Sequence, residues 1–306
     1  MKRKSMFSIL AFLCILTLLV PVSLAQENDE VLHVAVGIVP EATFVEAVAG
    51  ELADVVIMIP SGNSPANYQP TSKEMQALSD AAVYFTLQMP TEQANILPKV
   101  KDFNPDIVIV DLREAVAAQY PLLMMDEDED HEEAHDETAE DHDHTGVDPH
   151  LWLSPKRAIV MVQTIADQLS QRDPSNTDTY QSNATAYIAK LETLDTMIRE
   201  QTAVLGNQSF MIYHGAYGYF ADDYGLTMIA IEIQGKQATA AELQQVIDAA
   251  RENHITTVFY QAEFDDHQAA TVAEEIGGTA AQVAPLSPDY IQSLEDFVSA
   301  LALSKN

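Results

Sequence analysis

Short apolar runs alternate with amphipathic stretches along the chain, beginning at Val31. The runs, such as VLHVAVGI and DIVIVDL, have the length and the β-branched composition of buried strands. Stretches with helical spacing, such as EATFVEAVAGEL, separate them. Strands that alternate with helices predict a mostly parallel sheet covered by helices. The predicted strands of this first part cover residues 31–38, 54–59, 81–87 and 106–112.

The same rhythm returns in the last third of the chain. Thr239 and Glu242 form a capping-box pattern at the start of one helix, and a final helix is expected from Tyr290. The two parts therefore repeat one architecture without repeating residues. The predicted strands here cover residues 209–214, 227–233, 256–261 and 280–284.

Two helices are expected between these parts. The first begins after Ser154, a plausible N-cap that precedes Pro155. The second follows Pro174, runs to about Val204, and would be roughly 40–45 Å long at ~1.5 Å per residue. We therefore predict an α/β fold of two lobes with parallel-type sheets, joined by one long rigid helix, with a ligand site in the cleft between the lobes. The apolar stripe of the second helix is Tyr180, Ala184, Tyr187, Leu191, Leu194 and Ile198.

The expected segments follow from changes in composition. A basic start, an apolar run and a small-residue cleavage pattern predict a signal peptide over residues 1–25, and hence export across the cytoplasmic membrane. An N-terminal lobe over 26–173 contains an acidic, histidine-rich, flexible loop at 126–148. The long helix takes 174–205, and the C-terminal lobe takes 206–306.

Charge narrows the range of partners. The 306 residues carry a formal net charge of −32, which makes nucleic acid or an anionic membrane surface a poor partner and cations a natural one. An acidic surface suited to high salt would have the same composition. The single cysteine, Cys14, lies in the predicted signal peptide, so the mature chain offers no thiolate ligand.

Three residues are candidates for a metal site. His150 stands in DPHLWLSP, where proline and large apolar neighbours would hold it rigidly. His214 and Glu232 are each expected at the carboxyl end of a strand, where α/β folds place functional groups. Taken alone, His150 would more often be a cap or core histidine, and His214 would as often be a satisfied buried one. Together, two imidazoles and a carboxylate suit Zn²⁺ and would also accept Mn²⁺ or Fe²⁺.

The acidic loop holds a second set of histidines. A run of like charges is usually no more than a solvated surface segment. Four of the nine histidines lie in this loop, however, and weak capture of cations at several low-affinity sites is the interpretation we favour. These loop histidines are His131, His135, His142 and His144.

Five stretches together resemble one family. They are SPANYQPTSKEMQALSDAAVYF, DPHLWLSPKRAIVMVQTIADQL, YHGAYGYFADDYGL, IEIQG and VFYQAEFDD. Their order and spacing resemble the zinc- and manganese-binding subunits of metal ABC importers, the metal-specific periplasmic solute-binding proteins. The resemblance covers nearly the whole mature chain. It implies two α/β lobes bridged by a long helix, an extracytoplasmic location, and a membrane permease as partner.

The resemblance also implies ligands. His150 and His214 match two histidine ligands of the family, and Glu232 matches a carboxylate ligand of manganese-type members. The first family histidine is replaced by Ala66 in PANYQP, and a late aspartate is replaced by Ser287 in PLSPD. Candidates for the missing ligands are Asp289, Asn67, Tyr68 and Gln69, a water, or a histidine of the acidic loop.

The predicted function is therefore an extracytoplasmic binding protein, expected to be a monomer, that captures a divalent transition metal and delivers it to an ABC importer. Zn²⁺ is the first choice and Mn²⁺ the second. Because Ala66 and Ser287 replace family ligands, a metal buffer or a receptor for another small ligand is the alternative. A secreted metallohydrolase is a weaker one: HEEAH at 131–135 has the HExxH spacing but stands in the acidic loop, which has no helical pattern, and no phosphate loop or nucleophile elbow is present, so we expect no enzyme.

Overall fold

The computed structural model describes residues 31–125, 146–206, 208–232, 236–264 and 266–304. The predicted signal peptide and the four loop histidines lie outside these ranges. Within them, no helix is long and apolar enough to cross a membrane.

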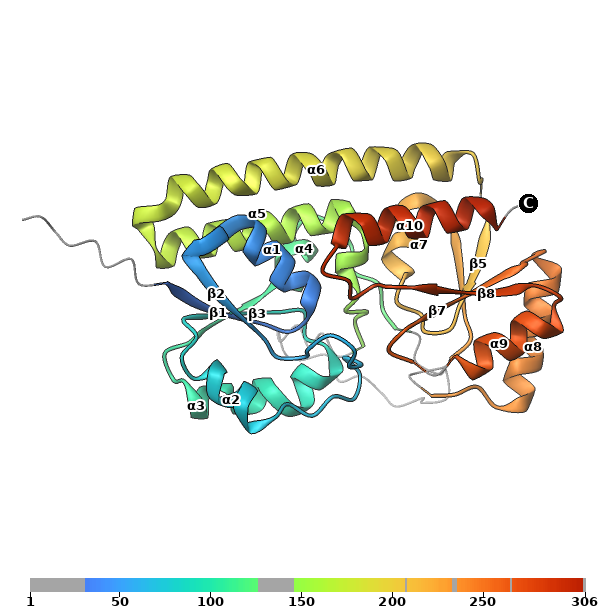
Figure 1. Ribbon diagram of the computed structural model, residues 1–306, viewed down its shortest axis with the longest axis horizontal. Helices are drawn as coiled ribbons and strands as arrows, with labels where there is room; N and C mark the ends of the chain where they lie inside the picture. The colour runs from blue at the N-terminus through green and yellow to red at the C-terminus, as the bar shows by residue number, and fades with distance from the viewer. Residues whose placement is uncertain (1–30, 126–145, 207, 233–235, 265, 305–306) are drawn as a thin grey trace, which may run out of the picture. The chain divides into compact units, whose positions relative to one another are not determined.

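Each lobe is built on a four-stranded parallel sheet, as predicted (Figure 1). The strand order is β2-β1-β3-β4 in the first lobe and β6-β5-β7-β8 in the second, so the two sheets have one topology. The strands of the first sheet are β1 (Leu32–Val36), β2 (Ala53–Ile57), β3 (Val83–Thr86) and β4 (Val108–Asp111). Those of the second are β5 (Ser209–Ile212), β6 (Thr227–Ala230), β7 (Thr257–Gln261) and β8 (Thr279–Val283).

Helices cover both faces of the first sheet, which explains its continuous apolar strands. Val34 and Val36 of β1 belong to the largest core cluster, whereas Ala35 between them belongs to a separate cluster on the opposite face. The helices are α1 (Val39–Ala49), α2 (Ser72–Leu78), α3 (Leu97–Phe103), α4 (Leu112–Ala117), α5 (Pro155–Arg172), α6 (Thr177–Ala203), α7 (Gly218–Tyr224), α8 (Ala240–Glu252), α9 (His267–Glu275) and α10 (Tyr290–Leu303).

Helix α6 has 27 residues and is the predicted long connection, lying along both lobes in Figure 1. Five of the six residues of its predicted stripe are buried, and Tyr187 is partly buried. The core beneath it is continuous, because the largest cluster contains Phe44 of α1 together with Phe210 of β5 and Phe297 of α10. The two lobes therefore share a core in addition to the connecting helix.

Some local predictions were wrong in detail. β5 ends at Ile212 and β6 at Ala230, so His214 and Glu232 lie in the loops just beyond the strands. The Ile231 N–H donates to the carbonyls of both Ile212 and Tyr213, which ends the regular ladder. α3 and α4 were not predicted.

The predicted helix caps had different outcomes. The capping box of Thr239 and Glu242 is confirmed. Ser154 occupies the N-cap position of α5, but its hydroxyl donates to Asp223 Oδ2 at 2.6 Å and caps nothing.

Two glutamates are fully buried side by side in the first lobe. Glu41 and Glu92 each accept a backbone N–H, and the Tyr84 hydroxyl donates to Glu92 Oε1 at 2.5 Å. Their carboxylates converge on Gly37, where a Cβ atom would lie 2.5 Å from Glu92 Oε1 and 2.9 Å from Glu41 Oε2. Burial raises the pKa of both glutamates, and the negative charge of Glu92 raises the pKa of Glu41 further.

Removing one of these acids should change how stability depends on pH. A folded-state pKa above the unfolded value gives stabilisation that is present below the unfolded pKa and lost as pH rises through the folded one. Glu41→Gln has no carboxyl group at this position, so it does not lose this stabilisation as pH rises. The free energy of unfolding of Glu41→Gln minus that of wild type should therefore increase between pH 5 and pH 8. Urea unfolding at both pH values measures this, with the exposed Glu51→Gln as control. Equal pH dependence in all three proteins would contradict the expectation.

Candidate metal centre

A cavity of about 620 Å³ is lined by residues of both lobes. It lies beyond the carboxyl ends of the strands. Parallel α/β sheets usually bind ligands there, at the point where the strand order reverses. In the second sheet this point lies between β5 and β7. His214 follows β5 and Gln261 ends β7, and both line the cavity. His150 lines it from the first lobe.

His150 is held by its neighbours in the DPH sequence. The Asp148 carboxylate accepts the His150 backbone N–H at 2.9 Å, and its Oδ1 lies 2.7 Å from Nδ1 of the ring. Trp152, in the buried turn that follows, donates its indole N–H to the Pro285 carbonyl of the second lobe at 2.9 Å. A neutral imidazole that donates Nδ1–H to a carboxylate leaves Nε2 as a free acceptor, which is the form that binds a metal.

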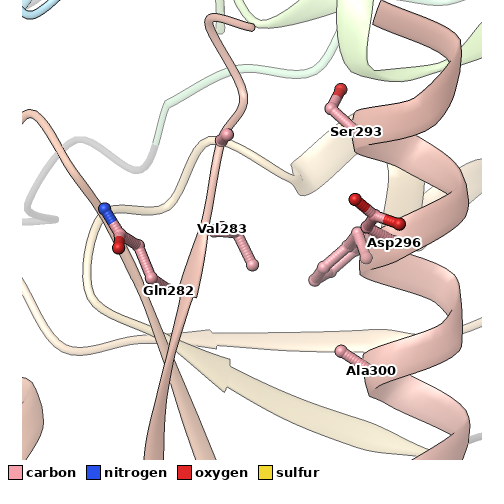
Figure 2. Close-up of a pocket in the computed structure, with 7 residues that line it drawn as sticks. Gln282, Val283, Ser293, Asp296 and Ala300 are labelled. Carbon is pink, nitrogen blue, oxygen red and sulfur yellow. The ribbon is translucent and has the colours of Figure 1, made fainter. Parts of the chain in front are cut away.

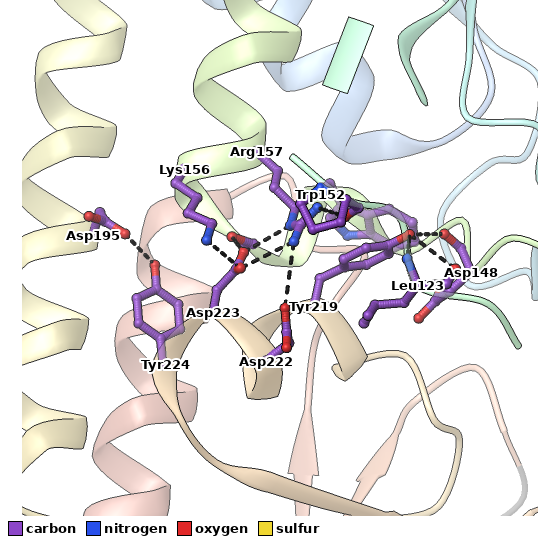
Figure 3. Close-up of polar contacts among 12 residues, drawn as sticks. Leu123, Asp148, Trp152, Lys156, Arg157, Asp195, Tyr219, Asp222, Asp223 and Tyr224 are labelled. Carbon is purple, nitrogen blue, oxygen red and sulfur yellow. Dashed lines mark hydrogen bonds and ion pairs between the residues drawn. The ribbon is translucent and has the colours of Figure 1, made fainter. Parts of the chain in front are cut away.

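Asp148 is itself fixed by the second lobe (Figure 3). The Tyr219 hydroxyl of α7 donates to the Asp148 carbonyl at 2.8 Å and accepts the Leu123 N–H at 3.1 Å. The Asp148 N–H donates to the Leu123 carbonyl at 2.8 Å. Gly218 allows the close approach, since a Cβ atom there would lie 2.9 Å from Asp148 Oδ2. The carboxylate behind His150 is therefore positioned by both lobes.

His214 is held from three sides. Its Nδ1 lies 2.6 Å from Glu232 Oε1, and the Gln261 side chain bonds its backbone N–H and carbonyl at 3.3 and 2.7 Å. Phe264 stacks on the ring, with centroids 4.7 Å apart and an interplanar angle of 25°. His214 therefore repeats the arrangement of His150, with Nδ1 on a carboxylate and Nε2 free.

The two free nitrogens face each other. Nε2 of His150 and Nε2 of His214 are 3.2 Å apart, although the residues are 64 positions apart in the chain. Two nitrogens at the usual Zn–N distance in a tetrahedral site are separated by about 3.3 Å. When both Nδ1 atoms donate to their carboxylates, the two Nε2 lone pairs point at one position. That position suits a cation.

The structure brings together the two predicted histidines and places Glu232 behind one of them. The Glu232 side chain is only 5% exposed, contacts Nδ1 of His214, and does not line the cavity. A carboxylate buried in this way needs a partner, and the partner of Glu232 is the His214 ring. Direct metal binding by Glu232 stays a prediction, and in this arrangement its Oε1 contacts Nδ1 of His214.

The other candidate ligands are spread out. Ala66 and Asn67 line the cavity. The Tyr68 hydroxyl is engaged with the Glu74 carboxylate at 2.9 Å, and Asp289 is exposed at the start of α10; neither lines the cavity. Across the described part of the chain, no three His, Cys, Asp or Glu side chains are already grouped to hold a metal ion.

Sequence reasoning missed the residues that support the histidines. Asp148 stands in the quoted DPH motif, where an aspartate two residues before a histidine can bond its N–H and ring. Gln261 and Glu263 stand in VFYQAEFDD, and both line the cavity. No spacing rule distinguishes them, because their relation to His214 arises from the pairing of β5 with β7.

A second cavity, of about 360 Å³, lies between β8 and α10 (Figure 2). Asp296 is the one carboxylate among the described residues that line it. It is exposed, and it accepts a hydrogen bond from Gln292 at 2.9 Å. No histidine is among those lining residues. The cavity that contains His150 and His214 is therefore the candidate metal centre.

Comparisons with known proteins show which family this chain belongs to. The family described as zinc-uptake complex component A, periplasmic (ZnuA) matches residues 34–303. The zinc-binding lipoprotein AdcA of Streptococcus pneumoniae is 33% identical over 98% of this chain, and the manganese-binding lipoprotein MntA of Halalkalibacterium halodurans is 27% identical over 82%. A crystal structure of ZnuA superposes with a TM-score of 0.79 at 31% identity, covering 90% of this chain and all of that one.

The relatives differ from this chain in length. This chain spans 59% of the pneumococcal AdcA and 78% of the MntA protein. The match therefore concerns one part of AdcA and most of MntA.

Proposed function

We propose that this chain, which belongs to the zinc-uptake complex component A (ZnuA) family, captures a divalent transition metal outside the cytoplasmic membrane for delivery to an ABC importer. One observation supports this most strongly. The Nε2 atoms of His150 and His214, one from each lobe, lie 3.2 Å apart at the cavity. Zinc is the first choice, since imidazole nitrogen suits it well, and manganese is the second.

Histidines and carboxylates of the chain would have different roles in metal binding. His150 and His214 would bind the metal through Nε2. Asp148 and Glu232 would fix the tautomer and the ring orientation of these histidines. Because the two histidines come from different lobes, the metal would join the lobes at the cavity. That junction is a surface that an importer permease could distinguish from the metal-free form.

A binding role accounts for these residues better than catalysis does. The two carboxylates nearest the imidazoles, Asp148 and Glu232, are each already paired with a ring Nδ1. A metallohydrolase would need a further base aimed at a metal-bound water. The metal-buffer alternative predicts only weak sites.

Titration of the purified, metal-free protein tests the proposal. Competition against a chromophoric chelator should give one tight site for Zn²⁺ per chain and weaker binding of Mn²⁺. Weak sites alone would support the metal buffer, and no binding of either ion would support a receptor for another ligand.

Ala66→His should strengthen zinc binding. Ala66 lines the cavity and is exposed, so an imidazole there could reach the metal without displacing a packed residue. Zinc prefers four ligands and favours nitrogen over water, whereas Mn²⁺ tolerates oxygen better. Affinity for Zn²⁺ should rise by more than affinity for Mn²⁺, as measured by the same competition assay.

A matched control is Gln69→His, which places a histidine on the same loop at an exposed residue that does not line the cavity. It should leave zinc affinity unchanged. If the folded Ala66→His variant binds zinc no better than the control, this loop does not line the metal site.

A further inference from the structure

Glu263 is a carboxylate that the site described so far does not use. Among the described residues that line the cavity, it carries the one carboxylate, alongside His150 and His214. Its Oε2 atom is buried and has no hydrogen-bond partner in the described part of the chain. A buried carboxylate oxygen without a hydrogen-bond partner is energetically unfavourable. A ligand bound in the cavity that Glu263 shares with the two imidazoles would supply that partner.

The backbone holds Glu263 close to His214. Gln261, two residues earlier, bonds both the N–H and the carbonyl of His214. Phe264, the next residue, stacks on the His214 ring and donates its N–H to the Gln261 carbonyl at 3.2 Å. Glu263 therefore lies on a turn that is attached on both sides to His214.

A carboxylate in the same cavity as two imidazoles would be stabilised by a cation bound between them. The described cavity otherwise lacks anionic ligands, since Ala66 and Ser287 replace two family ligands and Glu232 is engaged behind His214. The chemistry of the lining is thus two imidazoles and one carboxylate.

We infer that Glu263 is the third protein ligand of the metal, completing a two-histidine, one-carboxylate site with His150 and His214. The inference rests on the proposed function. Because no three such side chains are already grouped, the Glu263 side chain must turn toward the facing Nε2 atoms when the metal binds. The fourth coordination position is left for water.

Glu263→Gln tests the inference. It keeps the size of the side chain and removes the charge. Zinc affinity should fall at least about tenfold, because even outer-shell partners of a metal contribute that much. Glu274→Gln, on the exposed surface of α9, is the matched control and should bind as wild type does. Glu263→Asp keeps a carboxylate at shorter reach and should lie between the two.

X-ray absorption at the zinc edge supplies a second readout, which reports the ligands directly. Zinc-loaded wild type should show two imidazoles and a carboxylate, and Glu263→Gln should lose the carboxylate contribution. If wild type binds zinc tightly through two imidazoles and Glu263→Gln binds equally well, the inference is overturned and the proposed function stands. If wild type has no tight zinc site, the proposed function itself fails.

Discussion

We expect that replacing either His150 or His214 with alanine removes tight zinc binding and leaves the fold intact. Each histidine supplies one of the two facing nitrogens, so neither variant keeps the pair. A complete structural zinc site provides about 10–16 kcal/mol of binding, and loss of one of its few ligands should remove several kcal/mol. Competition against a chelator measures the affinity, and circular dichroism checks the fold.

His33→Ala is the control for these variants. His33 lies on β1, pairs with Asp54 at 3.4 Å and is half exposed, away from the residues that line the cavity. It should bind zinc as wild type does. Wild-type affinity in both cavity variants would show that the metal, if any, binds elsewhere.

Asp223→Ala should strongly destabilise the protein. Asp223, on α7 of the second lobe, and Arg157, on α5 of the first, have side chains only 1% exposed, with Nε and Oδ2 2.8 Å apart (Figure 3). Lys156 and Ser154 also donate to Asp223. Although burial opposes ionisation, these donors lower the pKa of Asp223, so its charged form is the bound one at neutral pH.

Truncating one member of such a pair leaves a buried, unpaired charge, which is unfavourable by about 3–5 kcal/mol. Arg157 would retain its Pro121 contact and its position over the Tyr219 ring, 4.4 Å from the centroid, but would lose its main partner. Urea unfolding of Asp223→Ala measures the loss.

Asp222→Ala is the adjacent control. Asp222 is 53% exposed and lies 3.8 Å from Arg157, so its removal should change stability by less than about 1 kcal/mol. Equal stability of the two variants would contradict the assigned role of the buried pair. Because Tyr219 contacts both Arg157 and Asp148, Asp223→Ala should also weaken zinc binding.

Much of the fold follows from local pattern. The apolar runs predicted the parallel strands because both faces of each are covered, and the stripe on α6 predicted which of its residues are buried. Helix α4 was missed because Leu112 continues the apolar run of β4, so one run contains both elements. A run of that kind carries no period that separates strand from helix.

The site was predictable only in part. His150 and His214 stand in recognisable motifs, and the structure places their Nε2 atoms together. The role of Glu232 was not readable, because its partner is set by the contact between the chain after β6 and that after β5. Glu263 was missed for a similar reason, since only the turn after β7 brings it to the cavity.

The most direct test of the account is the position of zinc in a crystal of the zinc-loaded protein, located by anomalous scattering. One zinc ion within about 2.1 Å of Nε2 of both His150 and His214 is the predicted result. A protein that takes up zinc only at the surface, with the two Nε2 atoms still facing each other across a metal-free gap, would contradict it.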